Sequence, residues 1–222
     1  MYAISAAVTC SGCRRYTNDR CTYPGLREYH LMFPMFYERF TQRSHIRMYS
    51  SHDGMVWKEV PGSPVITPEM IGAGIEFMGG RGDLVPFQDG VGLKVGGTPY
   101  PHKYQRWSHV LESHKSAWAC WPESRLCSVT TDEDGEFFMF PVIPVGRQLR
   151  VNARVRRAGD LRVGLFGVEE KSANDCRAIF GDHPSHQVVW NGQKDIGIEE
   201  GREIMLHFKL RAADVFGIEW ES

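Results

Sequence analysis

The chain has 222 residues, of which 42% are hydrophobic and 24% charged, and its formal net charge is -1. This near-neutral balance argues against the one-signed electric field that binds nucleic acid or an anionic membrane. No apolar run approaches the ~20 residues that span a bilayer, and the start lacks the basic segment of a signal peptide. We therefore take a cytoplasmic location as the default.

The six cysteines are too few for a dense disulfide framework. Cys10 and Cys13 form a C-x-x-C pair, Cys21 stands alone, and His30 is the nearest possible fourth ligand. Because this spacing matches no familiar zinc module, we expect free or buried thiols, with a metal or redox pair as the alternative. We expect no cofactor.

The first predicted strands follow a polar, irregular start. The aromatic run over residues 29–40 is β-prone and is broken by Pro34, and residues 44–51 alternate apolar and polar side chains as a half-buried strand does. Asp53-Gly54 then predicts a hairpin turn into a second strand. This stretch therefore indicates antiparallel β-structure.

The next segment repeats this pattern. Short strands are predicted over residues 75–78, 84–87 and 92–95, with Asp89-Gly90 as a hairpin turn. Residues 106–123 could form a short amphipathic helix, but we prefer a strand through "SAWACW". We expect residues 125–142 to form another hairpin, turning at Asp134-Gly135.

From residue 145 the alternation becomes regular. In residues 149–155 and 161–165 every second position is apolar, so the apolar side chains of each segment share one face. Residues 158–160 are predicted as the turn between the two segments. Similar alternation over residues 204–220 predicts further antiparallel strands. We therefore predict an all-β chain, divided at residues 142–148 into regions 1–144 and 145–222, the second an antiparallel β-sandwich. The turn "GDHPSHQ", with Asp182, His183 and His186, is expected to be a loop in this sandwich and no metal site.

Six segments carry a resemblance to a known family. They are "YHLMFPMFYERF", "IRMYSSHDGMVWKEVPGSPVI", "VGLKVGGTPYPHKY", "WPESRLCSVTTDEDGEFFMFPV" and "LRVNARVRRAGDLRVGLFG", followed by "MLHFKLRAADVFGIEW". In this order, over about residues 23–222, they resemble the C-terminal part of bacterial five-bladed β-propeller proteins related to glycoside hydrolase families 32 and 43. The resemblance implies partial propeller blades in 1–144, a C-terminal β-sandwich in 145–222, and missing N-terminal blades.

A five-bladed propeller needs roughly 250–350 residues, more than region 1–144 provides. An incomplete propeller leaves open sheet edges, which can pair with another copy of the chain. We therefore expect a homo-oligomer that covers these edges.

The expected catalytic residues are carboxylates. Hydrolysis of a glycosidic bond needs two of them, about 5–9.5 Å apart. Glu76 interrupts an apolar segment between glycines, where a charge is costly unless it faces a wet cavity, so it is the expected general acid. Asp83 or Asp53 would be the second carboxylate, although the Asp-Gly turn makes Asp53 better explained as a turn former, as it does Asp89.

The expected substrate contacts combine aromatic faces with polar groups, as sugar sites do. The resemblance places the segment "PHKYQRW" near the mouth of the site. We expect carbohydrate contacts from His102, Tyr104, Arg106 and Trp107, and from His30 on an inner strand.

Three functions remain open on this basis. The leading hypothesis is a carbohydrate-active protein resembling glycoside hydrolases, which would act through its carboxylate pair if it is an enzyme. The alternative is a non-catalytic carbohydrate-binding or assembly module without a complete active site. A third interpretation is a gene fragment without activity.

Overall fold

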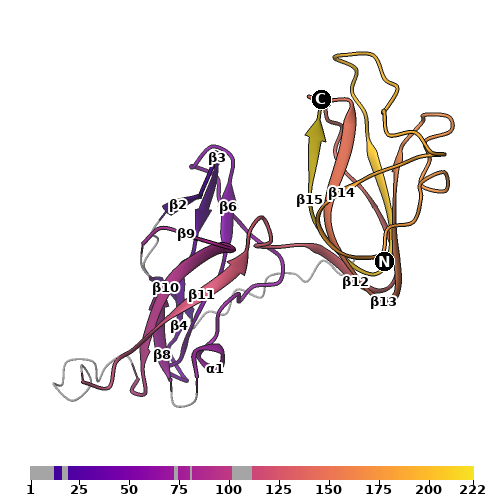
Figure 1. Ribbon diagram of the computed structural model, residues 1–222. Coiled ribbons are helices and arrows are strands. Elements are labelled where there is room, and N and C mark those ends of the chain that lie inside the picture. The colour runs from indigo at the N-terminus through magenta and orange to yellow at the C-terminus, as the bar shows by residue number, and fades with distance from the viewer. Residues whose placement is uncertain (1–12, 17–19, 73–74, 81, 102–111) are drawn as a thin grey trace. The chain divides into compact units, whose positions relative to one another are not determined.

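The computed structural model describes residues 13–16, 20–72, 75–80, 82–101 and 112–222. Strands dominate these ranges, and the only α-helix within them is the four-residue α1 (Pro68–Ile71), so the predicted all-β class is confirmed (Figure 1). The chain forms two compact units, Met1–Pro122 and Glu123–Ser222. Among the residues described, no helical segment has the length and hydropathy of a membrane-spanning helix.

The first part of the first unit forms two antiparallel sheets. One sheet contains β1 (Cys13–Tyr16), β4 (Met35–Glu38) and β5 (Ser44–Ile46), and the other contains β2 (Arg20–Tyr23), β3 (Leu26–Met32), β6 (Tyr49–Ser51) and β7 (Lys58–Glu59). The chain passes from one sheet to the other between β3 and β4, and returns between β5 and β6. The break between β3 and β4 contains Pro34, which has no N–H to donate to a ladder. Its carbonyl instead accepts the N–H of Arg47, at 3.1 Å, in the matching break between β5 and β6.

A third sheet of this unit has the order β11-β10-β8. It is formed by β8 (Phe77–Gly80), β9 (Val85–Phe87), β10 (Gly90–Thr98) and β11 (Lys115–Pro122), with β9 paired to β10. The strand expected through "SAWACW" is thus confirmed over the helix alternative. Gly90 pairs with Phe87 and Tyr49 with Glu59, which confirms the hairpins predicted at Asp89-Gly90 and Asp53-Gly54.

The two parts of the first unit meet at Ser44 and Met78. The Ser44 hydroxyl donates to the Met78 carbonyl at 2.8 Å and accepts the Met78 N–H at 2.7 Å. Met78 and the nearby Ile46 are fully buried, and Leu93 of β10 is also in the core. Within the described ranges, the sheets close neither a barrel nor a propeller ring.

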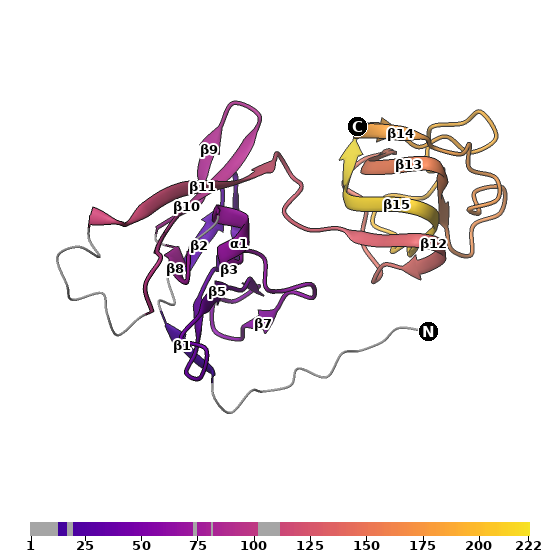
Figure 2. The same ribbon diagram turned by 90° about the horizontal axis from the view of Figure 1, so that it is seen from below.

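The second unit is built on one four-stranded antiparallel sheet, with the order β12-β15-β13-β14 (Figure 2). Its strands are β12 (Val129–Phe138), β13 (Gln148–Leu165), β14 (Gly181–Gln187) and β15 (Leu206–Glu221). Because β12 pairs with β15, it belongs to this unit, although region 1–144 was expected to contain it.

Two turns predicted in this part of the chain are wrong. Asp134-Gly135 turns no hairpin, because β12 runs through it and only shifts register between Thr131 and Asp134. Residues 158–160 form no turn either: β13 continues, with a register shift between Val155 and Asp160 and a positive φ of 65° at Ala158. In both places the long partner β15 supplies a continuous ladder, and a bulge absorbs the extra residues.

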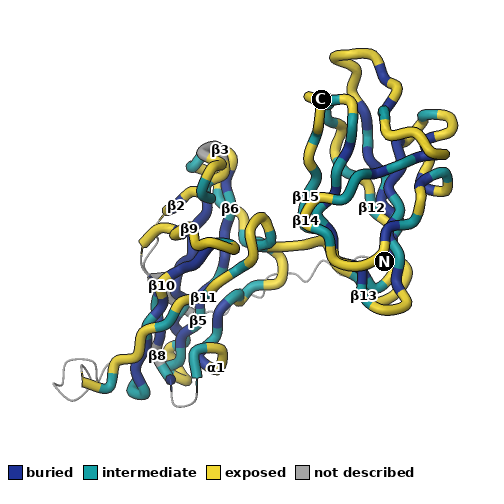
Figure 3. Tube along the Cα trace, viewed as in Figure 1, coloured by how far each residue is buried: buried dark blue, intermediate teal, exposed yellow. Residues whose placement is uncertain are grey.

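The core of the second unit lies between the sheet and the segments 166–180 and 188–205, which cover it. Alternate residues of β13, among them Leu149 and Val163, are fully buried, as is Trp190 of the second covering segment (Figure 3). The Trp190 indole N–H donates to the Val163 carbonyl at 2.7 Å. The sequence predicts two sheets here, whereas the second layer consists of irregular chain and β14 belongs to the single sheet.

Candidate functional site

Asp53 lies in the turn between β6 and β7. Its Oδ1 accepts the backbone N–H groups of Val56 and Met55, both at 2.8 Å, and the Ser51 hydroxyl at 2.9 Å. Gly54 takes the positive φ, 70°, that the turn requires. The bonds from Val56, Met55 and Ser51 lower the pKa of Asp53 to about 2. Its carboxylate therefore holds the turn closed and is ionised at neutral pH.

Glu76 precedes β8 at the surface of the first unit. Its side chain is 47% exposed, and its Oε2 lies 3.4 Å from Nε of Arg43. Arg43 also binds Glu69 of α1, so the two glutamates share one guanidinium. The predicted general acid is thus an ion-paired surface carboxylate.

The strand register separates Glu76 from Asp83. The Glu76 N–H donates to the Thr98 carbonyl at 2.9 Å. Asp83 lies between Gly80 and Val85, which pair with Val95 and Gly92. Those partners are three and six residues from Thr98, which is about 10–20 Å along a strand. A carboxylate pair for glycoside hydrolysis spans about 5–9.5 Å.

Asp53 lies on a third segment. It follows β6, and its Oδ1 is bonded within the turn between β6 and β7. The three predicted carboxylates therefore lie on three different segments, namely this turn, the residues before β8 and the connection between β8 and β9.

The predicted substrate contacts are only partly described. His30 lies on β3 opposite Ser51 of β6, half-buried, and its Nδ1 is a buried atom with no hydrogen-bond partner among the described residues. His102, Tyr104, Arg106 and Trp107 lie outside the described residues, so their role stays a prediction.

Four cysteines, Cys21, Cys120, Cys127 and Cys176, are free thiols. Cys21 and Cys176 are buried, whereas Cys120 and Cys127 are exposed. Burial raises the pKa of Cys21 to about 11, which keeps it a neutral, unreactive thiol. Cys10 lies outside the described residues.

Asp182, His183 and His186 lie on β14, where a loop was expected. Asp182 pairs with Arg125 at 2.6 Å, and His183 Nε2 bonds the Phe180 carbonyl at 2.7 Å. The Arg125 side chain also donates to Asn152 at 2.9 Å and covers the Phe216 ring at 4.7 Å. These contacts are structural ones on the outer face of the sheet.

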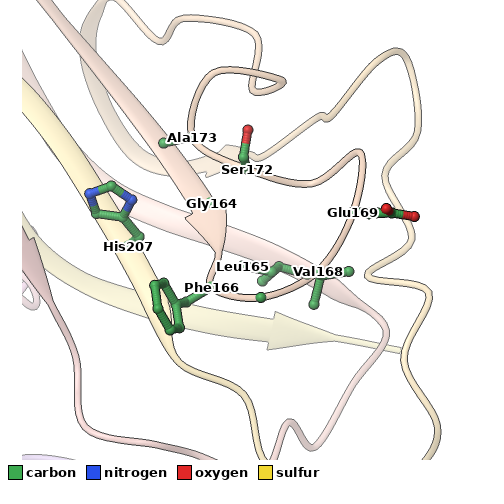
Figure 4. A pocket seen from close by; sticks show the side chains of 9 residues that line it. Gly164, Leu165, Phe166, Val168, Glu169, Ser172, Ala173 and His207 are labelled. Atoms are coloured by element: carbon green, nitrogen blue, oxygen red, sulfur yellow. The ribbon is translucent and has the colours of Figure 1, made fainter.

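A pocket of about 350 Å³ lies in the second unit, where β13 ends and the chain folds back over it (Figure 4). The chain end of β13 and the following loop supply most of its wall, and His207 of β15 supplies the rest. The lining residues are Gly164, Leu165, Phe166, Gly167, Val168, Glu169, Ser172, Ala173 and His207.

Aromatic rings lie at the rim of this pocket. The His207 ring stacks on Phe138, with centroids 4.2 Å apart and planes at 9°, and Phe138 meets Phe166 edge to face at 5.5 Å. Phe138 is 47% and Phe166 61% exposed. His207 is oriented by Glu136, whose Oε2 lies 3.0 Å from its Nε2. The rim therefore presents two partly exposed phenylalanine side chains to solvent.

Gly164 permits the loop to fold over the strand. A Cβ at this position would lie 2.2 Å from the backbone nitrogen of Ala173. The returning chain is fixed by Ser172, whose N–H and hydroxyl both donate to Oδ2 of Asp175, at 2.9 and 2.6 Å. These two bonds lower the pKa of Asp175.

No family model, curated protein or solved structure matches this chain. The resemblance to propeller glycoside hydrolases therefore stays a prediction.

Sequence reasoning missed this pocket. Its residues come from positions about 40 apart, and only β13–β15 pairing, which sets Gly164 opposite His207, joins them. The local signal is Phe166, an aromatic residue next to Gly167 that breaks the alternation after buried Leu165. Exposed ring faces beside a carboxylate and a hydroxyl suit a ligand that has apolar faces and hydroxyl groups.

Proposed function

We propose that this chain binds carbohydrate without hydrolysing it, through the pocket at Phe166 and His207. The observation that carries the proposal is the exposed ring pair at the rim, Phe138 and Phe166. Sugar rings cover such faces with their C–H groups, and Ser172 and Glu169 offer oxygen atoms to the hydroxyls. A volume of about 350 Å³ suits a small ligand.

The positions of the predicted carboxylates favour binding over hydrolysis. Glu76 is paired with Arg43, Asp83 lies about 10–20 Å away along β10, and Asp53 is bonded within its own turn. A glycosidase with this chain would need other residues for its acid and its nucleophile or base.

The test is a titration of the protein with methyl glycosides, in which calorimetry or ligand-observed NMR measures binding. Phe166→Ala should weaken binding by about two- to tenfold, the range expected for loss of an aromatic contact. Phe180→Ala is the matched control, since Phe180 is equally exposed at 61% and does not line the pocket. Equal effects of the two substitutions would contradict the assignment of the pocket.

A panel of nitrophenyl glycosides tests the hydrolytic alternative on the same protein. We expect no release of nitrophenol. If the wild type releases nitrophenol and Glu76→Gln releases less, the glycosidase hypothesis is established and binding without hydrolysis is overturned.

A further inference from the structure

We infer that the pocket at Phe166 and His207 accepts uncharged or amino sugars and discriminates against acid sugars such as uronates. The inference rests on the proposed function and adds the ligand's charge to it. It follows from which polar groups of the wall are already bonded and which are free.

The hydrogen-bond donors of the wall are largely used within the protein. The N–H groups of Leu165 and Phe166 donate to the carbonyls of Lys171 and Met205, at 2.7 and 2.8 Å. The Val168 N–H donates back to Leu165 at 3.3 Å. The Ser172 N–H and hydroxyl are both given to Asp175. Of the other lining residues in the described loop, Gly167, Glu169 and Ala173 keep N–H groups that make no backbone hydrogen bond, so the wall offers a ligand carboxylate only these few donors.

The nearby cationic side chains are also engaged elsewhere. The Lys171 ammonium is buried against the Trp190 ring, 5.6 Å from its centroid, and donates to Gln193 at 3.2 Å. The Lys209 ammonium donates to Asn174 at 3.2 Å. His207, the one lining residue that can carry a positive charge, faces Glu136.

The free side-chain groups of the wall are acceptors. Glu169 is exposed at the outer bend of the loop (Figure 4), and no hydrogen bond or ion pair joins its carboxylate to another described residue. Ser172 retains the lone pairs of its hydroxyl oxygen. Glu136 and Asp175 add negative charge behind His207 and Ser172. Ligand hydroxyl or ammonium groups match this wall, whereas a ligand carboxylate meets like charge.

The test uses methyl glucoside, methyl glucosaminide with its amine protonated, and methyl glucuronide, titrated at low salt. We expect the glucosaminide to bind tightest and the glucuronide weakest, with steps of about two- to fivefold, the size of an exposed charge interaction. Added salt should reduce both differences in affinity, that between glucosaminide and glucoside and that between glucoside and glucuronide.

Glu169→Gln should reduce the preference for the glucosaminide over the glucoside. Glu170→Gln is the matched control, because this neighbouring glutamate is exposed and is not part of the wall. A glucuronide that binds as tightly as the glucoside would overturn the inference and leave sugar binding intact. Absence of binding for all three glycosides would overturn the proposed function, and the inference with it.

Discussion

Hydrogen bonds lower the pKa of two aspartates that differ in burial, Asp53 and Asp214. Asp53 is exposed, and its turn supplies the N–H groups that lower its pKa. Asp214 is buried, and burial alone would raise its pKa, but the Thr130 hydroxyl at 2.5 Å and the guanidinium of Arg154 at 3.0 Å outweigh burial and lower it. Only the first could be predicted, because the Asp-Gly turn is local, whereas the partners of Asp214 lie 58 or more positions away.

The turn bonds of Asp53 make a specific pH dependence of stability. A carboxylate with a lowered folded pKa stabilises the fold above its unfolded pKa, near 3.8, and loses this contribution as the pH falls to about 2. Asp53→Asn should therefore melt below the wild type at neutral pH, and the difference should shrink between pH 4 and pH 2. Thermal melts across this range measure it.

The substitution should leave sugar affinity unchanged, because Asp53 is turn-forming and lies outside the pocket. Asp89→Asn, in the second Asp-Gly turn, controls for removal of a surface charge. A difference in melting temperature that persists unchanged at pH 2 would contradict the role assigned to the turn bonds.

Among the elements, the end of β13 is the one that makes the pocket. Gly164→Ala would place a Cβ against the backbone of Ala173, which cannot move without displacing the loop. We expect a loss of about 1–3 kcal/mol in the free energy of unfolding, the usual cost of overpacking, together with weaker sugar binding. Urea unfolding and glycoside titration measure the two effects.

Gly217→Ala is the matched control on β15, because nothing lies within 4 Å of the Cβ it would add. It should leave both stability and affinity near those of the wild type. If the two alanine variants behave alike, the close approach at Gly164 does not shape the pocket.

Turn signals predict elements only as far as the partner strand allows. Asp53-Gly54 and Asp89-Gly90 form hairpins because no ladder runs past either turn: β6 ends at Ser51, and the ladder of β10 with β11 begins at Gly90. Asp134-Gly135 has the same local preference, but the 16-residue β15 pairs on both sides of it and keeps β12 continuous. The turn preference of an Asp-Gly pair stabilises the chain less than the hydrogen bonds and side-chain packing of a strand ladder that runs past it.

At the scale of the whole molecule, the strand content and the antiparallel class could be predicted from alternation, whereas the site could not. The separation of Glu76 from Asp83 depends on register with β10, and register is set by long-range pairing. The pocket likewise depends on pairing between β13 and β15. Alternation in one segment carries no information about which distant residues it will face.

Assembly is the remaining prediction at this scale. In the described part of the chain β11 is an edge strand of its sheet, and most of its side chains are exposed. We therefore expect a second copy of the chain to pair along β11. Light scattering in reductant should give the mass of an oligomer. Cys120→Lys, which puts a charge on this exposed edge opposite Gly92, should give the monomer.

Cys120→Ser is the control for loss of the thiol and should keep the oligomer. A wild-type chain that is monomeric at high concentration would contradict pairing along β11.

Trp190 gives the molecule a built-in optical reporter. Its indole is fully buried and bonded to a backbone carbonyl, whereas Trp118 in the first unit is 47% exposed. A buried indole fluoresces at shorter wavelength and is shielded from collisional quenchers in solution. The blue edge of the emission spectrum therefore follows the opening of the second unit, while acrylamide quenches exposed indoles such as that of Trp118.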